Sequence, residues 1–135
     1  MIIFDTHVLL WLMFELHKLG EISKNIIQTK FSQQLIAIPA ICFWEIEMLQ
    51  RKQRINLGIS TIEFRSQLLL KGFQEVATNG SIGILADQLT LHPDSADRLI
   101  TATAIYHNYT LLTADGKIID WQLSNPNLKL YNAKK

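Results

Sequence analysis

Residues 1–14 read MIIFDTHVLLWLMF, and the fold class follows from how this stretch begins. Residues 2–4 are an unbroken apolar run of strand-forming side chains, which is typical of a strand buried on both faces of a parallel sheet. Asp5 follows this run directly, and residues 8–17 are expected to form a short helix. The stretch is too short to span a bilayer, which takes about 20 apolar residues, and it lacks the basic start of a secretory signal. We therefore expect a core strand, no membrane span and a cytoplasmic protein.

Short apolar strands and helices alternate along the rest of the chain. Strands are expected at residues 35–38, 110–113 and 128–131, and helices at residues 23–33, 39–51, 61–71, 82–89, 94–108 and 117–123. Ser23 is the expected N-cap of the helix that it begins, Ser60 or Thr61 caps the helix at 61–71, and Gly72 ends that helix. The last five residues are expected to be a loose tail. This alternation predicts an α/β architecture with a mostly parallel sheet.

The composition fits a single globular domain that spans residues 1–135. Hydrophobic residues make up 48% of the chain and charged residues 19%, which argues against a disordered chain. The formal net charge is only +1, so any surface that binds nucleic acid must be a local patch. Cys42 is the one cysteine, so an internal disulfide is impossible, which fits a reducing compartment.

Two aspartates stand where a parallel sheet binds its ligands, beyond the carboxyl ends of the strands. Asp5 follows the first expected strand, and Asp115 follows the strand at residues 110–113. Both side chains are therefore expected at the same rim of one sheet. The alternative is that each aspartate only caps the turn or helix that comes after it.

Glu45 is less easily explained by structure alone. In the helix expected at residues 39–51, the neighbours three and four positions away are Ile41, Cys42, Met48 and Leu49, all of them apolar. A carboxylate on a core-facing side is costly unless it is paired or binds a cation. We expect a functional role for Glu45, with a structural salt bridge as the alternative.

The segment 92–98 (HPDSADR) opens the helix that is most clearly marked in the sequence. Asp94 suits the N-cap, and Asp97 falls at the third helical position, where acids also favour the helix dipole. Arg98 is expected to pair with Asp94 at a spacing of four. Because Asp94 and Asp97 share one helix face, both are expected to look at one site.

A cluster of such carboxylates has a definite chemistry. Mg²⁺ prefers hard oxygen ligands, and several carboxylates hold one or two ions while leaving places for water and phosphate. The ion acidifies a bound water and neutralises charge that develops on phosphate. The four histidines, His7, His17, His92 and His107, show no metal-ligand spacing and are expected to be packing or surface residues.

Four segments together resemble a PIN domain, and specifically a VapC-type toxin ribonuclease. They are residues 3–12 (IFDTHVLLWL), 43–46 (FWEI), 94–104 (DSADRLITATA) and 111–115 (LLTAD). Their order and separations match the family, and the resemblance covers nearly the whole chain. The chain departs from many relatives at Phe43, where they carry a small residue, and at Ser95, where they carry proline. Neither departure removes an acid.

The resemblance implies a three-layer α/β/α sandwich around a mainly parallel sheet. The catalytic residues and metal ligands that it implies are Asp5, Glu45, Asp97 and Asp115, and the supporting residues are Thr6, Asp94 and Thr113. It also implies an endoribonuclease that depends on Mg²⁺, with Mn²⁺ able to substitute. Such an enzyme is the toxin of a toxin–antitoxin pair, with RNA as substrate, a small antitoxin protein as partner and a homodimeric assembly.

Three other interpretations are weighed against the nuclease. A receiver-like signalling module also binds Mg²⁺ at strand ends, but it needs paired acids after its first strand and has no use for Glu45. A phosphatase of the Asp-x-Asp type is disfavoured because residues 5–7 (DTH) lack the second aspartate. A catalytically inactive PIN domain kept for interaction stays open, as do the RNA target and the number of ions.

Overall fold

Five short strands form one parallel sheet. They are β1 (Ile2–Phe4), β2 (Ile36–Pro39), β3 (Gln74–Val76), β4 (Thr110–Thr113) and β5 (Lys129–Asn132). The computed structural model describes all 135 residues, and the strand order is β3-β2-β1-β4-β5. The central strand β1 sets the register, because its Ile2 lies opposite Ile36 of β2 and Thr110 of β4. Every residue of β1 and β2 is buried, as the unbroken apolar runs predict.

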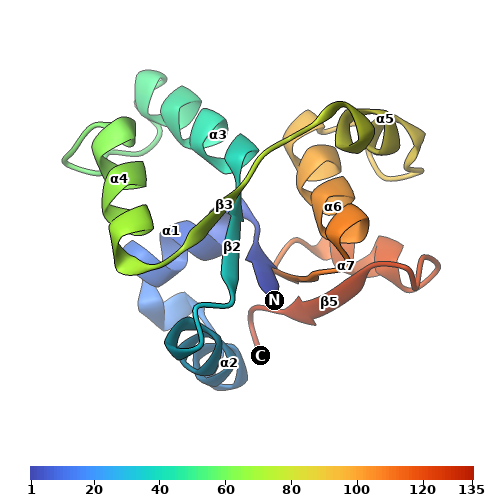
Figure 1. Ribbon diagram of the computed structural model, residues 1–135, viewed down its shortest axis with the longest axis horizontal. Helices are drawn as coiled ribbons and strands as arrows, with labels where there is room; N and C mark the ends of the chain where they lie inside the picture. The colour runs from blue at the N-terminus through green and yellow to red at the C-terminus, as the bar shows by residue number, and fades with distance from the viewer.

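Helices connect the strands and cover both faces of the sheet. They are α1 (Thr6–Phe14), the 3₁₀ helix η1 (Leu16–Lys18), α2 (Glu21–Ser32), α3 (Ala40–Arg51), α4 (Thr61–Lys71), α5 (Gly80–Gln88), α6 (Ser95–His107) and α7 (Gly116–Gln122). Figure 1 shows α1 and α4 on one side of the sheet, and α6 and α7 on the other. The expected three-layer α/β/α sandwich is confirmed. None of these helices has the length and apolar character that crossing a bilayer demands.

The direction of the chain across the sheet reverses at β1. The chain runs outward from β1 to β2 and β3, then returns to the other side of β1 to form β4 and continues to β5. In parallel sheets, ligands bind beyond the carboxyl ends of the strands at such a point. Asp5 follows β1 and Asp115 lies two residues beyond β4, so the topology places both acids there.

Two helices begin and end where their sequence signals predict. The Ser60 side chain accepts a hydrogen bond from the Glu63 N–H at the start of α4, and Gly72 ends that helix with φ at 111°. Asp94 caps α6 by accepting from the Asp97 N–H, and Asn108 ends the helix in the left-handed conformation. Left-handed backbone favours glycine and asparagine, which explains both stops.

Two local predictions were wrong, and one strand was missed. Ser23 does not cap α2, because the helix already begins at Glu21, and the buried Ser23 hydroxyl donates to the Asn132 carbonyl at 3.2 Å. The C-terminal residues are no loose tail, since Ala133 is fully buried and its N–H donates to the Thr113 carbonyl at 2.8 Å. Strand β3 was not expected, because its first two residues are exposed and polar. It forms by pairing with β2 at the edge of the sheet.

Candidate metal centre

Asp5 lies buried at the end of β1, with only 4% of its surface exposed. One carboxylate oxygen, Oδ1, accepts from the Val8 N–H at 2.9 Å and so caps α1. The other, Oδ2, accepts from the hydroxyl of Thr113 at the end of β4. The Thr113 hydroxyl in turn accepts from the Asp115 N–H at 3.0 Å. Thr113 therefore links the two aspartates that the sequence predicted at one rim of the sheet, and the strands that they follow, β1 and β4, are neighbours.

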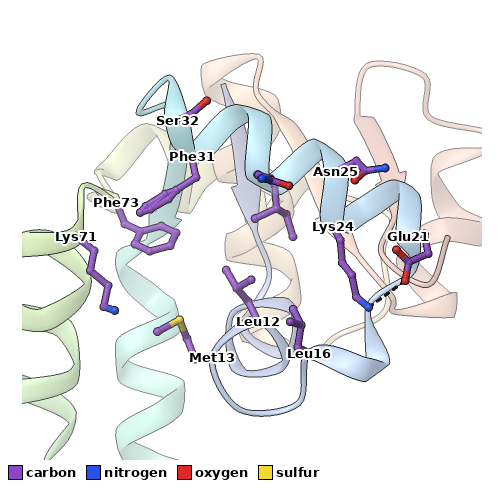
Figure 2. Close-up of a pocket in the computed structure, with 12 residues that line it drawn as sticks. Leu12, Met13, Leu16, Glu21, Lys24, Asn25, Phe31, Ser32, Lys71 and Phe73 are labelled. Atoms are coloured by element: carbon purple, nitrogen blue, oxygen red, sulfur yellow. Dashed lines mark hydrogen bonds and ion pairs between the residues drawn. The ribbon is translucent and has the colours of Figure 1, made fainter.

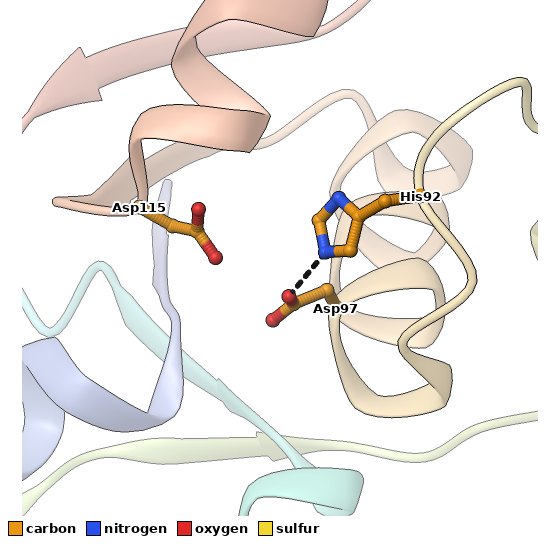
Figure 3. A group of neighbouring side chains, drawn as sticks. All are labelled: His92, Asp97 and Asp115. Carbon is orange, nitrogen blue, oxygen red and sulfur yellow. Dashed lines mark hydrogen bonds and ion pairs between the residues drawn. The ribbon is translucent and has the colours of Figure 1, made fainter.

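Asp115 and Asp97 meet across the site from different layers of the fold. Asp115 caps α7 by accepting from the Lys117 N–H at 2.9 Å, and Asp97 belongs to the first turn of α6. Together with His92 they offer ligand atoms that all lie within 4.8 Å of one another. Figure 3 shows the Asp97 and Asp115 carboxylates and the His92 ring gathered in one place. Residues that are far apart in the sequence thus converge on a volume that one ion could fill.

His92 was expected to be a packing or surface residue, and the structure instead places it in this group. Its Nε2 lies 2.7 Å from Asp97 Oδ2, and its Nδ1 is buried without a hydrogen-bond partner. The ring reaches Asp97 because the loop before α6 folds back over the first turn of that helix. A spacing of five residues across a helix start does not reveal such a contact, so the sequence carried no usable signal for it.

The fold raises the pKa of two site carboxyls. Burial raises the pKa of Asp97 from 3.8 to about 6; the His92 hydrogen bond opposes this shift, and the charges of Asp94 and Asp115 add to it. Burial also raises the pKa of Asp5, against the hydrogen bonds from Thr113 and Val8, with the Asp115 charge adding to the rise. Clustered acids in partly dry surroundings hold their protons more tightly unless a cation compensates them.

Glu45 stands apart from the tight group. It is half-buried in the middle of α3, as its apolar neighbours predict. Neither Glu45 nor Asp5 is among the side chains whose ligand atoms converge within 4.8 Å, so only Asp97 and Asp115 of the four predicted ligands belong to that group. The charge of Glu45 still acts on the same part of the core as the charge of Asp5. Burial raises the pKa of the Cys42 thiol, and the negative charges of Asp5 and Glu45 both raise it further. Glu45 forms no ion pair, so the structural salt bridge considered for it is absent.

Arg98 does not pair with Asp94 as expected. Its guanidinium instead donates to the carbonyls of Ala86, Leu89, Leu91 and His92, at distances of 2.7 to 3.1 Å. Arg98 therefore holds the end of α5 and the loop that carries His92. Asp94 keeps its predicted capping role and remains exposed, and Thr6 is buried at the start of α1 with no hydrogen-bond partner for its hydroxyl.

The residues present fit a divalent cation. The structure contains four ion pairs, and none brings a lysine or an arginine onto Asp5, Asp97 or Asp115. The convergent donors are carboxylate oxygens and one imidazole, a set that suits Mg²⁺ or Mn²⁺. Within the cluster, His92 is the one side chain that can carry a positive charge, and it contacts Asp97 alone among the acids.

Comparison with known proteins agrees with this geometry. The model of the PIN domain family matches residues 2–121. Ribonuclease VapC22 of Mycobacterium tuberculosis (strain ATCC 25618 / H37Rv) is 30% identical over 119 residues, which covers 87% of this chain and 88% of the relative.

Solved structures share the fold at lower sequence identity. VapBC2 from Rickettsia felis, bound to a DNA fragment from its promoter, matches with a TM-score of 0.68 at 20% identity, covering 98% of each chain. FitAcB from Neisseria gonorrhoeae matches with a TM-score of 0.65 at 17% identity, again over 98% of each chain. The match to the family model and the identity to the mycobacterial relative exclude the receiver and phosphatase interpretations, and the chain belongs to the PIN domain family.

Proposed function

We propose that this chain is a metal-dependent endoribonuclease that acts in the cytoplasm as the toxin of a toxin–antitoxin pair. The observation that carries the proposal is the convergence of Asp97, Asp115 and His92 beside the buried Asp5, with no lysine or arginine paired to the acids. Similarity to a relative named as a ribonuclease supports RNA as the substrate. Family membership alone leaves open a PIN domain that has lost activity, and the intact acid cluster argues against that alternative.

We infer that Asp5, Asp97 and Asp115 hold Mg²⁺, which Mn²⁺ can replace, and that Glu45 completes the set from α3. A bound divalent ion supplies Lewis acidity toward a water molecule and toward the phosphate. Thr113 fixes the orientation of Asp5 and of the backbone at Asp115, so these donors are arranged before any ligand arrives. His92 holds Asp97 through one oxygen, Oδ2, and so restricts the orientation of that carboxylate.

The proposal predicts that cleavage of single-stranded RNA requires both the metal and the acids. Purified protein should cut RNA in Mg²⁺ or Mn²⁺ and stop in EDTA, and Asp5→Asn should lower the rate by on the order of 100-fold or more. Asparagine keeps the shape and can still cap α1, so the loss would report the missing charge.

The control is Glu63→Gln, which removes an exposed acid on α4 and should leave cleavage unchanged. Thermal unfolding provides a second readout, because an ion that binds only the folded state raises the melting temperature as its concentration rises. The Asp5→Asn variant should lose most of that rise. Equal cleavage in EDTA, or in the Asp5→Asn protein, would contradict the proposal.

We further propose that a small antitoxin binds an apolar groove away from the acids. The groove has a volume of about 760 Å³ and lies between α1, η1, α2 and the Phe73 region. Figure 2 shows Leu12, Met13 and Leu16 facing Phe31 and Phe73 across it. Leu16 is 50% exposed and lines the groove, so a partner that buried it there would gain free energy. A homodimer remains a prediction, and light scattering of the purified protein tests it.

A further inference from the structure

A second cavity opens directly beside the acids. Its volume is about 230 Å³, and the residues that line it are Asp5, His7, Trp11, Ala114, Asp115 and Lys134. Lys134 is exposed and takes part in none of the four ion pairs, although two carboxylates line the same cavity. The cavity therefore holds the acids of the proposed metal site together with one lysine that no acid neutralises.

The backbone around Lys134 is held firmly in place. The Ala133 N–H donates to the Thr113 carbonyl at 2.8 Å, and the Ala133 carbonyl accepts from the Gly20 N–H at 3.0 Å. The Lys135 carbonyl accepts from the Ile22 N–H at 2.9 Å, at the start of α2. The C-terminal residues thus lie between β4 and the first turn of α2, and they carry Lys134 to the acid cavity as part of the folded structure.

Gly20 makes this arrangement possible. A Cβ atom at position 20 would lie 2.1 Å from the Lys135 carbonyl carbon and 2.4 Å from its oxygen, both of them backbone atoms. Any larger residue would therefore push the C-terminal segment away from α2. This close approach gives a way to move Lys134 without changing its charge.

We propose that Lys134 binds the phosphate backbone of the RNA substrate beside the bond that is cut. The acids repel RNA wherever a bound cation does not balance them, and a positive charge on the cavity wall attracts the neighbouring phosphate against that repulsion. A lysine acts on phosphate as a point charge, and such contacts position the nucleic acid without reading its sequence. The inference rests on the proposed nuclease function and names the residue that grips the substrate.

Binding is measured with a fluorescent single-stranded RNA in the Asp5→Asn background, where the substrate stays intact. Lys134→Gln should weaken RNA affinity by roughly three- to tenfold. The loss of log affinity per unit of log salt concentration should become smaller by about 0.7, which is the contribution of one phosphate contact on a single strand. Lys134→Arg should restore both values. Lys135→Gln is the matched control, because Lys135 is exposed and does not line the cavity.

Gly20→Ala tests the position of Lys134 independently. It should reduce RNA affinity as Lys134→Gln does, and combining the two changes should cost no more than the larger single loss. An unchanged salt slope in Lys134→Gln, or an equal loss in Lys135→Gln, overturns the inference. Because this assay needs no cleavage, a failure of catalysis by the native chain in Mg²⁺ would overturn only the nuclease proposal.

Discussion

Asp5 and Asp115 each cap a helix with one carboxylate oxygen, Oδ1. The second oxygen of Asp5 accepts from the Thr113 hydroxyl, and the second oxygen of Asp115 makes no hydrogen bond within the protein. Capping and metal binding were alternatives when only the sequence was considered, yet the geometry allows both. A cap needs one acceptor per helix start, whereas a carboxylate carries two oxygens. Asp97 is held in a similar way, since His92 contacts its Oδ2.

The raised pKa of Asp97 predicts how stability without metal depends on pH. Its pKa of about 6 in the folded protein exceeds its ordinary value of 3.8, so the folded state binds more protons between these values. The contribution of Asp97 to the free energy of unfolding therefore falls as pH rises from 4 to 6, and stays lower above that range. In EDTA at pH 7.5, Asp97→Asn should melt at a higher temperature than the native protein, and the difference should shrink toward pH 4.

Calorimetry across this pH range measures the effect. Asp120→Asn, which changes an exposed acid on α7, should show no such pH-dependent gain. The raised pKa at Asp97 would be contradicted if the native protein became steadily more stable from pH 4 to 7.5 and Asp97→Asn melted at no higher temperature than the native protein.

At the scale of elements, one side chain fixes the connection between α5 and α6. The Arg98 guanidinium donates to backbone carbonyls at the end of α5 and in the loop after it, those of Ala86, Asp87, Leu89, Leu91 and His92. The planar arrangement of its donors suits this task, and a lysine cannot reproduce it. The loop shape then determines where His92 lies against Asp97.

Arg98→Lys should therefore lower the free energy of unfolding by about 2–3 kcal/mol, because charged hydrogen bonds are lost and several carbonyls remain without a donor. Urea unfolding measures the change. Arg65→Lys is the matched control, since Arg65 pairs with Glu75 on the surface, where an ion pair contributes only about 0–1 kcal/mol. Equal losses in the two variants would show that the loop does not depend on Arg98.

At the scale of the whole molecule, the acid site and the apolar groove are separate regions. The acids stand beyond the carboxyl ends of β1 and β4, whereas the groove lies between α1, η1 and α2. The two sets of lining residues do not overlap. Partner binding and catalysis can therefore be damaged one at a time.

A charge placed in the groove should weaken partner binding and spare cleavage. Leu16→Glu should reduce co-purification with the co-expressed antitoxin by at least about tenfold, because it puts a charge into an interface that excludes water. Leu70→Glu is the control, since Leu70 is 87% exposed and lies outside the groove. Loss of RNA cleavage in Leu16→Glu, or retention of the antitoxin, would contradict this separation.

The sequence by itself determined the α/β class, the positions of β1, β2 and β4, and the ends of α4 and α6. These features depend on local physics: unbroken apolar runs for buried strands, side-chain caps for helix starts, and left-handed stops. It also determined that Asp5 and Asp115 lie at the same rim of the sheet, because a parallel sheet brings the carboxyl ends of its strands to one edge. That β1 and β4 are neighbours was shown only by the structure.

Only the tertiary structure decided the strand β3, the anchored C-terminal residues, and the contacts of His92, Arg98 and Lys134. Each of these features depends on a partner far away in the sequence or on the course of a loop. β3 forms by pairing with β2, the C-terminal residues are held by α2 and β4, and the loop between α5 and α6 positions His92. The positions of these polar side chains follow no repeating pattern in the sequence, and their contacts are set by the groups that the folded backbone brings next to them. Their assignment therefore had to wait until the folded chain showed which groups meet.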